Sequence, residues 1–195
     1  MMQELFDALG QYIEKKTEAM HTALPGTIVS FNPQTGLAVV RPQMKYKTKD
    51  GQKLDYPDIS SVPVVIPQAN AQGVTIAYPI KAGDGCLLIM SEQSNDYFLY
   101  GQETDTDLKF DLSNAIAIVG LFRTVNQQLV RACSMNEIVL ANGNNVFSIG
   151  SSGVKIEGNL TVTGSVIAPS VKAGGVEMAG HIHRYGSNSP TSGPE

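Results

Sequence analysis

Two histidines near the end of the chain are the strongest candidates for chemistry. His181 and His183 are separated by one residue, and the chain contains only one other histidine, His21. In an extended segment, residues i and i+2 point to the same side, so both imidazoles can reach one metal ion. One chain supplies two nitrogen ligands, which is too few for a closed site. Two chains supply four, which suits tetrahedral zinc, and three chains supply six, which fills an octahedron.

A metalloenzyme is one reading of this histidine pair. Such an enzyme needs a third protein ligand and an open coordination position. Glu177 is the nearest carboxylate, four residues before His181 and on the same strand face. With only three histidines in the chain, no catalytic set of Ser/His/Asp or Cys/His type is credible. We therefore expect Glu177 to face solvent and the protein not to be an enzyme.

Composition limits the function classes further. Charged residues make up 16% of the 195 residues, 19 residues are glycine and 42% are hydrophobic, which favours β-structure over helix and over disorder. The formal net charge of -4 argues against a general nucleic-acid binder, and we expect the basic run 45–53 to be a solvated hairpin. Cys86 and Cys133 form no metal or redox motif, and Cys86 is expected to be a buried free thiol, consistent with synthesis in a reducing cytosol.

The histidine pair follows a segment with the pattern of short strands. Eight of the 19 glycines lie between residues 143 and 180. From 154 to 166 apolar and polar residues alternate, so the apolar ones share one strand face: Val154, Ile156, Leu160, Val162 and Val166. Glycines at 158 and 164 mark possible kinks between strands, as in a β-helix or solenoid. This segment is too small to bury a core alone, so we predict that residues 136–180 form a shaft wound from three chains.

The earlier part of the chain predicts two further segments. Residues 1–24 contain an amphipathic helix over residues 3–19, which packs either on its own domain or on a partner. Residues 25–110 predict an OB-like β-barrel, with strands at 27–31, 37–41, 62–67, 86–90 and 97–100 separated by turns. Residues 111–135 are expected to connect the barrel to the shaft. The predicted fold class is therefore all-β, with a metal-binding apex at 181–195.

Three stretches together resemble the central spike family of contractile tails, typified by the spikes of phages P2, Mu and phi92 and related to R-type bacteriocin spikes. The first joins 62–67 to 78–84, the second is 111–115, and the third is 180–183 with 192–194 near the end of the chain. The resemblance covers most of the chain from about residue 25. Its most specific part is the placement of His181 and His183.

The resemblance implies a mechanical function. Members of this family have an OB-like domain followed by a trimeric β-helix, with one iron at the apex that would be held here by His181 and His183 of all three chains. The implied partners are two further copies of the chain, a tail hub or baseplate protein at the N-terminal end, and the bacterial outer membrane that the spike punctures. The implied location is the baseplate tip of the virion, and no nucleic acid is expected as a partner. The alternatives are an OB-fold binding or adaptor module and the metalloenzyme described above.

Overall fold

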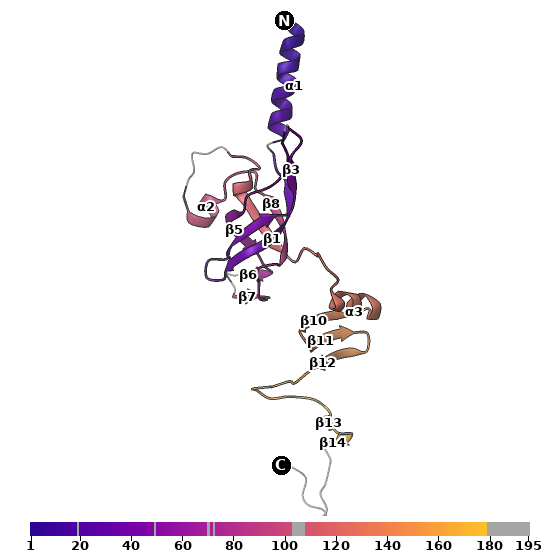
Figure 1. The fold of residues 1–195 in the computed structure, drawn as a ribbon. Helices are drawn as coiled ribbons and strands as arrows, with labels where there is room; N and C mark the ends of the chain where they lie inside the picture. Colours follow the sequence, from indigo (N-terminus) through magenta and orange to yellow (C-terminus); the bar gives the residue numbers. More distant parts are fainter. Residues whose placement is uncertain (19, 49, 70, 72, 103–107, 179–195) are drawn as a thin grey trace, which may run out of the picture. The chain divides into compact units, whose positions relative to one another are not determined.

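The computed structural model describes residues 1–18, 20–48, 50–69, 71, 73–102 and 108–178. The chain divides into two compact units, Met1–Val125 and Asn126–Glu195. We describe each unit by itself. Figure 1 shows the elements and their labels.

The centre of the first unit is a closed five-stranded barrel. Its strands, in their order around the barrel, are β1 (Ala23–Asn32), β2 (Leu37–Pro42), β5 (Ile59–Val65), β9 (Ala115–Val119) and β8 (Gly85–Met90). The pair β5–β9 is parallel, and the other four pairs are antiparallel. This strand order is that of an OB-type Greek-key barrel and agrees with the predicted β-barrel.

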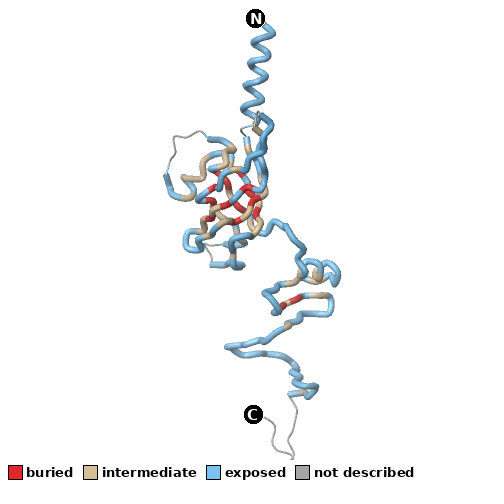
Figure 2. The backbone as a smooth tube through the Cα atoms, in the orientation of Figure 1, coloured by how far each residue is buried: buried red, intermediate tan, exposed pale blue. Residues whose placement is uncertain are grey.

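The barrel forms because its strands alternate between two environments. In β8, Cys86, Leu88 and Met90 point into the core, whereas the residues between them are less buried. The same alternation in the other strands completes the core: Ile28, Ala38, Val40, Ile59, Val62, Ala115 and Ala117. Figure 2 shows these buried residues gathered in the barrel. Cys86 is a buried free thiol, as predicted, and burial raises its pKa to about 11.

Close packing fixes two glycines of the barrel. A Cβ atom at Gly26 would lie 2.8 Å from Cγ1 of Val40 and 3.1 Å from Sγ of Cys86. A Cβ atom at Gly85 would clash with the carbonyl oxygen of Leu121, which is backbone and cannot rotate away. At Gly26, core side chains of the neighbouring strands leave no room for a side chain, and at Gly85 the backbone of another segment passes directly over the strand.

The strand that closes the barrel lies after residue 110, within the segment that we expected to be a connector. β9 pairs with β8 and β5, and its Ala115 and Ala117 are buried. A short 3-10 helix, η2 (Leu112–Asn114), precedes it, and the side chain of Asp111 accepts a hydrogen bond from the Ser113 backbone N–H. A five-residue apolar strand is too short to be told from a packed loop by its pattern alone.

The other elements of the first unit lie before the barrel strands or between them in the sequence. Helix α1 (Met2–Glu18) occupies the segment in which the residue spacing predicts a helix. Two hairpins, β3 (Lys45–Lys47) with β4 (Lys53–Asp55) and β6 (Gln68–Ala69) with β7 (Val74–Thr75), lie between barrel strands. The β3–β4 hairpin contains the basic run and is exposed, as expected.

The prediction of a strand at 97–100 was wrong. This segment is helix α2 (Asp96–Tyr100). The acidic Asp96 lies in its first turn, and Gly101 ends it with a left-handed φ of 68° while its N–H donates to the carbonyl of Tyr97. The aromatic residues of this segment have a high propensity for strands, which led to the prediction. The glycine that follows them is equally compatible with the end of a short helix.

The second unit contains a helix and small antiparallel sheets. Helix α3 (Gln127–Met135) precedes a three-stranded sheet in the order β10 (Ile138–Asn142), β11 (Asn145–Gly150) and β12 (Gly153–Glu157). The short strands β13 (Lys172–Ala173) and β14 (Val176–Glu177) form a hairpin. Residues 158–171, between β12 and β13, form no strand in the single chain, although the alternating pattern predicts strands up to residue 166. The described residues are thus mostly β, with few helices.

Candidate assembly surface

One face of the β10–β11–β12 sheet carries two aligned rows of apolar side chains, and the row beyond them is polar, with Asn142 of β10 paired to Asn145 of β11. The register aligns Ile138 of β10 with Ile149 of β11, which in turn pairs with Val154 of β12. A second row, two residues further along each strand, aligns Leu140, Phe147 and Ile156. Because residues two apart in a strand share a face, these six side chains lie on the same side of the sheet.

Nothing in the described part of the chain covers this face. Five of the six side chains are exposed, with exposed fractions of 65% for Ile138, 61% for Leu140 and 62% for Val154, and Phe147 is half-buried. Isolated apolar residues on a surface are ordinary, but six in two aligned rows form a contiguous patch of the kind that marks an interaction site. We call these six residues the apolar sheet face.

The opposite side of the same sheet is partly covered, although Ala141 of β10 is exposed there. Val146 and Ser148 of β11 are buried on that side. The side chain of Asn126 caps α3 by accepting hydrogen bonds from the N–H groups of Gln128 and Leu129. Helix α3 contacts β10. The sheet therefore has one side that is partly covered and one side with two uncovered apolar rows.

Arg131 of α3 fixes the helix to the sheet. Its Nε donates to Oε1 of Glu137 at 2.6 Å, and its Nη1 and Nη2 donate to the two carboxylate oxygens of Glu157 at 3.0 Å each. Lys155 adds a fourth contact, from Nζ to Oε1 of Glu157 at 2.8 Å. The paired, two-atom contact of a guanidinium with a carboxylate is geometrically specific as well as favourable.

These contacts shift the titration of the acidic residues. Hydrogen bonds from Arg131 and then from Lys155 lower the pKa of Glu157 from 4.5 to about 2. The hydrogen bond from Arg131 also lowers the pKa of Glu137, and the same pairs raise the pKa of Arg131. Both carboxylates therefore favour the ionised form, in which they pair with Arg131.

Beyond β12 the chain turns at Gly158, where φ is 124°. A Cβ atom there would also approach Oδ1 of Asn145, but that atom ends a flexible side chain, so the positive φ is the main reason for glycine. This agrees with the kink predicted at 158. The apolar residues that follow, Leu160, Val162 and Val166, are exposed in the single chain and extend the uncovered apolar surface of the second unit.

The predicted metal ligands, His181 and His183, lie outside the described residues. The third histidine, His21, packs its ring edge-on against Tyr56 with the ring centroids 5.7 Å apart, and its backbone N–H donates to the carbonyl of Phe110. Within the described ranges, no group of three or more His, Cys, Asp or Glu residues is arranged to hold a metal ion. Likewise, none of the described helices is long and apolar enough to cross a membrane.

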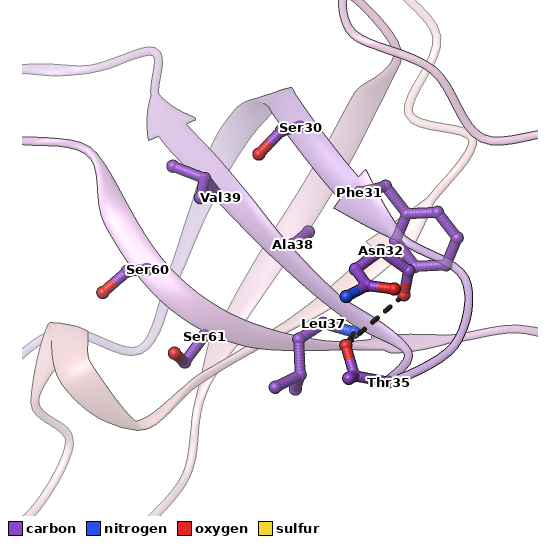
Figure 3. Close-up of a pocket in the computed structure, with 9 residues that line it drawn as sticks. All are labelled: Ser30, Phe31, Asn32, Thr35, Leu37, Ala38, Val39, Ser60 and Ser61. Atoms are coloured by element: carbon purple, nitrogen blue, oxygen red, sulfur yellow. Dashed lines mark hydrogen bonds between the residues drawn. The ribbon is translucent and has the colours of Figure 1, made fainter.

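The barrel also has a hollow of about 400 Å³ on its surface (Figure 3). It lies over β1, β2 and β5 and is lined by Ser30, Phe31, Asn32, Thr35, Leu37, Ala38, Val39, Ser60 and Ser61. The strand pairing is irregular on both sides of β2 here, and Ser61 has a positive φ of 58°. None of the nine lining residues is charged, so the hollow offers hydrogen bonds and apolar contact but no general acid or base.

The sequence alone predicted part of the apolar sheet face. Val154 and Ile156 follow from the alternating pattern, but the four members on β10 and β11 depend on the register between strands. Arg131 has its partner Glu157 twenty-six residues away in the sequence. The hollow depends on two strand irregularities that have no signature in the sequence.

Comparison with known proteins finds a similarity for the barrel of the first unit. Residues 24–120 match a family model described as the phage protein Gp138 N-terminal domain. The matched range begins at the start of β1 and ends just after β9, so it coincides with the closed barrel. No curated protein matches the chain. The barrel is therefore similar to the N-terminal domain of a phage protein, which supports a phage structural protein of the baseplate type in general.

Proposed function

We propose that this chain is the central spike protein at the tip of a contractile tail. In this proposal three copies assemble into a needle that punctures the bacterial outer membrane when the tail contracts, without catalysis. The match of residues 24–120 to a phage protein domain supports the phage context. The apolar sheet face is the single observation that carries the proposal, because it calls for cover that the described chain does not provide.

Identical chains are the simplest source of that cover. A three-fold axis brings the same face of each copy together, so the rows of Ile, Leu, Val and Phe side chains meet one another. The segment 158–169 adds a second argument, since it forms no strand and is exposed in one chain, and its backbone groups would need hydrogen-bond partners once an assembly buried them. Neighbouring chains wound around the same axis would supply both the apolar cover and the hydrogen bonds. This is the intertwined β-helix that the resemblance implies.

The barrel in this proposal mounts the spike on a tail hub protein. The chain carries a formal net charge of -4, and the hollow over β2 and β5 has no basic lining residue. Both features disfavour nucleic acid as a partner, because binding to the phosphate backbone requires basic side chains. The spike would therefore be a virion component that is located at the tip of the baseplate.

His181 and His183 are proposed to hold one iron ion per trimer. Six imidazole nitrogens suit an octahedral first-row metal, and three chains of one protein supply that number. The ion would tie together three chain ends, which otherwise open first in most proteins. A fully occupied octahedron leaves no position for a substrate, which is why we propose a structural role for the metal.

A matched pair of substitutions on β10 tests the assembly. Leu140→Asp places a carboxylate on the apolar sheet face, and Ala141→Asp places the same group on the other, exposed side of the same strand. Three buried carboxylates without partners are strongly unfavourable, so Leu140→Asp should abolish trimers. Light scattering should give three chain masses for the wild type and for Ala141→Asp. A trimer of Leu140→Asp would show that this face is not the interface.

An OB-fold binding module is the second candidate, and the hollow favours it. OB folds bind ligands over their second and third strands and the loop between the first two, which here are β2, β5 and the turn after Asn32. A binding module of this kind does not require the apolar sheet face to be covered. A monomer that stays soluble and folded at micromolar concentration would favour the module over the spike.

A further inference from the structure

Helix α1 carries a second apolar face that the described chain leaves uncovered. All described side chains of the helix are exposed, including Leu5, Leu9, Tyr12 and Ile13. We propose that the α1 helices of three copies pack against one another as a parallel coiled coil. This inference rests on the trimer proposed above, and it adds a separate contact at the start of the chain.

The residues of α1 follow a heptad repeat. With Met2 at position a, positions a and d contain Met2, Leu5, Leu9 and Tyr12, spaced by three, four and three residues. This 3-4-3 spacing aligns side chains along one seam of a helix, and such a seam packs knobs-into-holes against the same seam of another helix. The repeat continues until Lys16, the next a position.

The apolar face is too broad for a simple two-helix seam. Positions e and g are also apolar through residue 13, with Met1 and Ala8 at g and Phe6 and Ile13 at e. Positions b, c and f contain no large apolar residue over the same span, only Gln3, Glu4, Asp7, Gly10, Gln11 and Glu14. In a three-helix assembly each helix contacts two neighbours, so positions e and g are buried as well as a and d. The division of residues in α1 therefore fits three helices.

Charge placement fits parallel helices related by a three-fold axis. Cyclic symmetry makes the helices parallel and in register, so each g position meets the following e position of a neighbour. The resulting pairs are Met1 with Phe6 and Ala8 with Ile13, which are all apolar. The acidic residues Glu4, Asp7 and Glu14 lie on the outside, where like charges from three copies stay apart and solvated.

The end of the repeat also matches the end of the helix. Nζ of Lys16 lies over the ring of Tyr12, 5.8 Å from its centroid. The contact places the charged group of Lys16, at position a, over the aromatic ring of Tyr12, at position d, near the end of the helix. The seam is thus apolar for two heptads and closes with a cation that can reach solvent.

An isolated helix of this length is only marginally stable in water. Helices of about 15 residues are marginal even with favourable sequences. Gly10 lies in the middle of α1, where glycine costs about 1 kcal/mol relative to alanine. Contacts between copies would supply the burial that α1 lacks by itself.

Cysteine cross-linking of the full chain tests the proposal. In a Cys133→Ser background, Ala8→Cys together with Ile13→Cys places thiols at neighbouring g and e positions. Oxidation of the assembled protein should give covalent dimers and trimers on a non-reducing denaturing gel. The matched control is Asp7→Cys with Glu14→Cys, whose thiols lie on the outside and should leave the chains as monomers. Cys86 is buried and remains in both variants.

Each outcome decides the proposal. The mass of the reduced variants in solution, measured by light scattering, first shows whether trimers form. Monomers would overturn the coiled coil together with the trimeric spike. Trimers in which the Ala8 and Ile13 thiols give no cross-link, or in which the control cross-links equally, would overturn the coiled coil alone. In that case the apolar face of α1 is available to another protein, such as a hub.

Discussion

Arg131 joins three segments of the second unit. It extends from α3 to Glu137, which directly precedes β10, and to Glu157 at the end of β12. Its side chain is 21% exposed, and that of Glu137 is 12% exposed, so solvent competes only partly for these contacts. This arrangement holds α3 on one side of the sheet and leaves the apolar sheet face on the other.

The lowered pKa of Glu157 makes this contact dependent on pH. The pKa is about 2 in the folded chain and 4.5 for the free group, so the contribution to stability is complete above pH 4.5 and is lost as the pH falls towards 2. Arg131→Met should therefore lower the thermal midpoint of the protein at neutral pH. The difference from wild type should shrink between pH 4.5 and pH 2.

Circular dichroism melting across this pH range measures the effect. Lys155→Met is the matched control, because it removes the more exposed of the two cations that contact Glu157 and should cost less. A constant difference between wild type and Arg131→Met at all pH values would show that the ion pair does not cause the effect.

Hydrogen exchange of the segment after β12 tests whether neighbouring chains complete its strands. Residues 159–166 alternate between apolar and polar but form no strand in one chain. If neighbouring chains complete the strands, the backbone N–H groups of this segment are hydrogen-bonded and should exchange slowly with deuterated solvent. Exchange measured by mass spectrometry should show protection here in the wild type and its loss in Leu140→Asp. Rapid exchange in a wild-type trimer would mean that this segment is not part of an intertwined shaft.

The sequence predicts elements better than their partners. The barrel strands follow from short apolar runs bounded by turns, such as residues 86–90. All five residues of that run are apolar, so only the structure shows that Cys86, Leu88 and Met90 are the ones that face the core. β9 was assigned to a connector because five apolar residues carry no period that separates a strand from a loop. The shaft residues Val154 and Ile156 were recognised, whereas Ile138 and Leu140 join them only through strand register, which depends on contacts across the sheet.

At the scale of the whole molecule, the two units carry different kinds of information. The first has its own core and matches a phage protein domain over residues 24–120. In the second, the described residues bury only Val146 and Ser148 and expose most of their large apolar side chains. A unit with so little core gains stability mainly by association. The proposed spike accounts for this contrast between a barrel with its own core and a unit whose described residues bury little.

Native mass spectrometry of the full-length protein tests the central claim most directly, because one spectrum reports both the number of chains and any retained metal. The proposal predicts a complex of three chains with one iron ion. His181→Ala combined with His183→Ala should lose the ion and keep the three chains, and His21→Ala should keep both. A wild-type mass of one or two chains would contradict the trimeric spike, and one metal ion per chain would contradict the shared site at its tip.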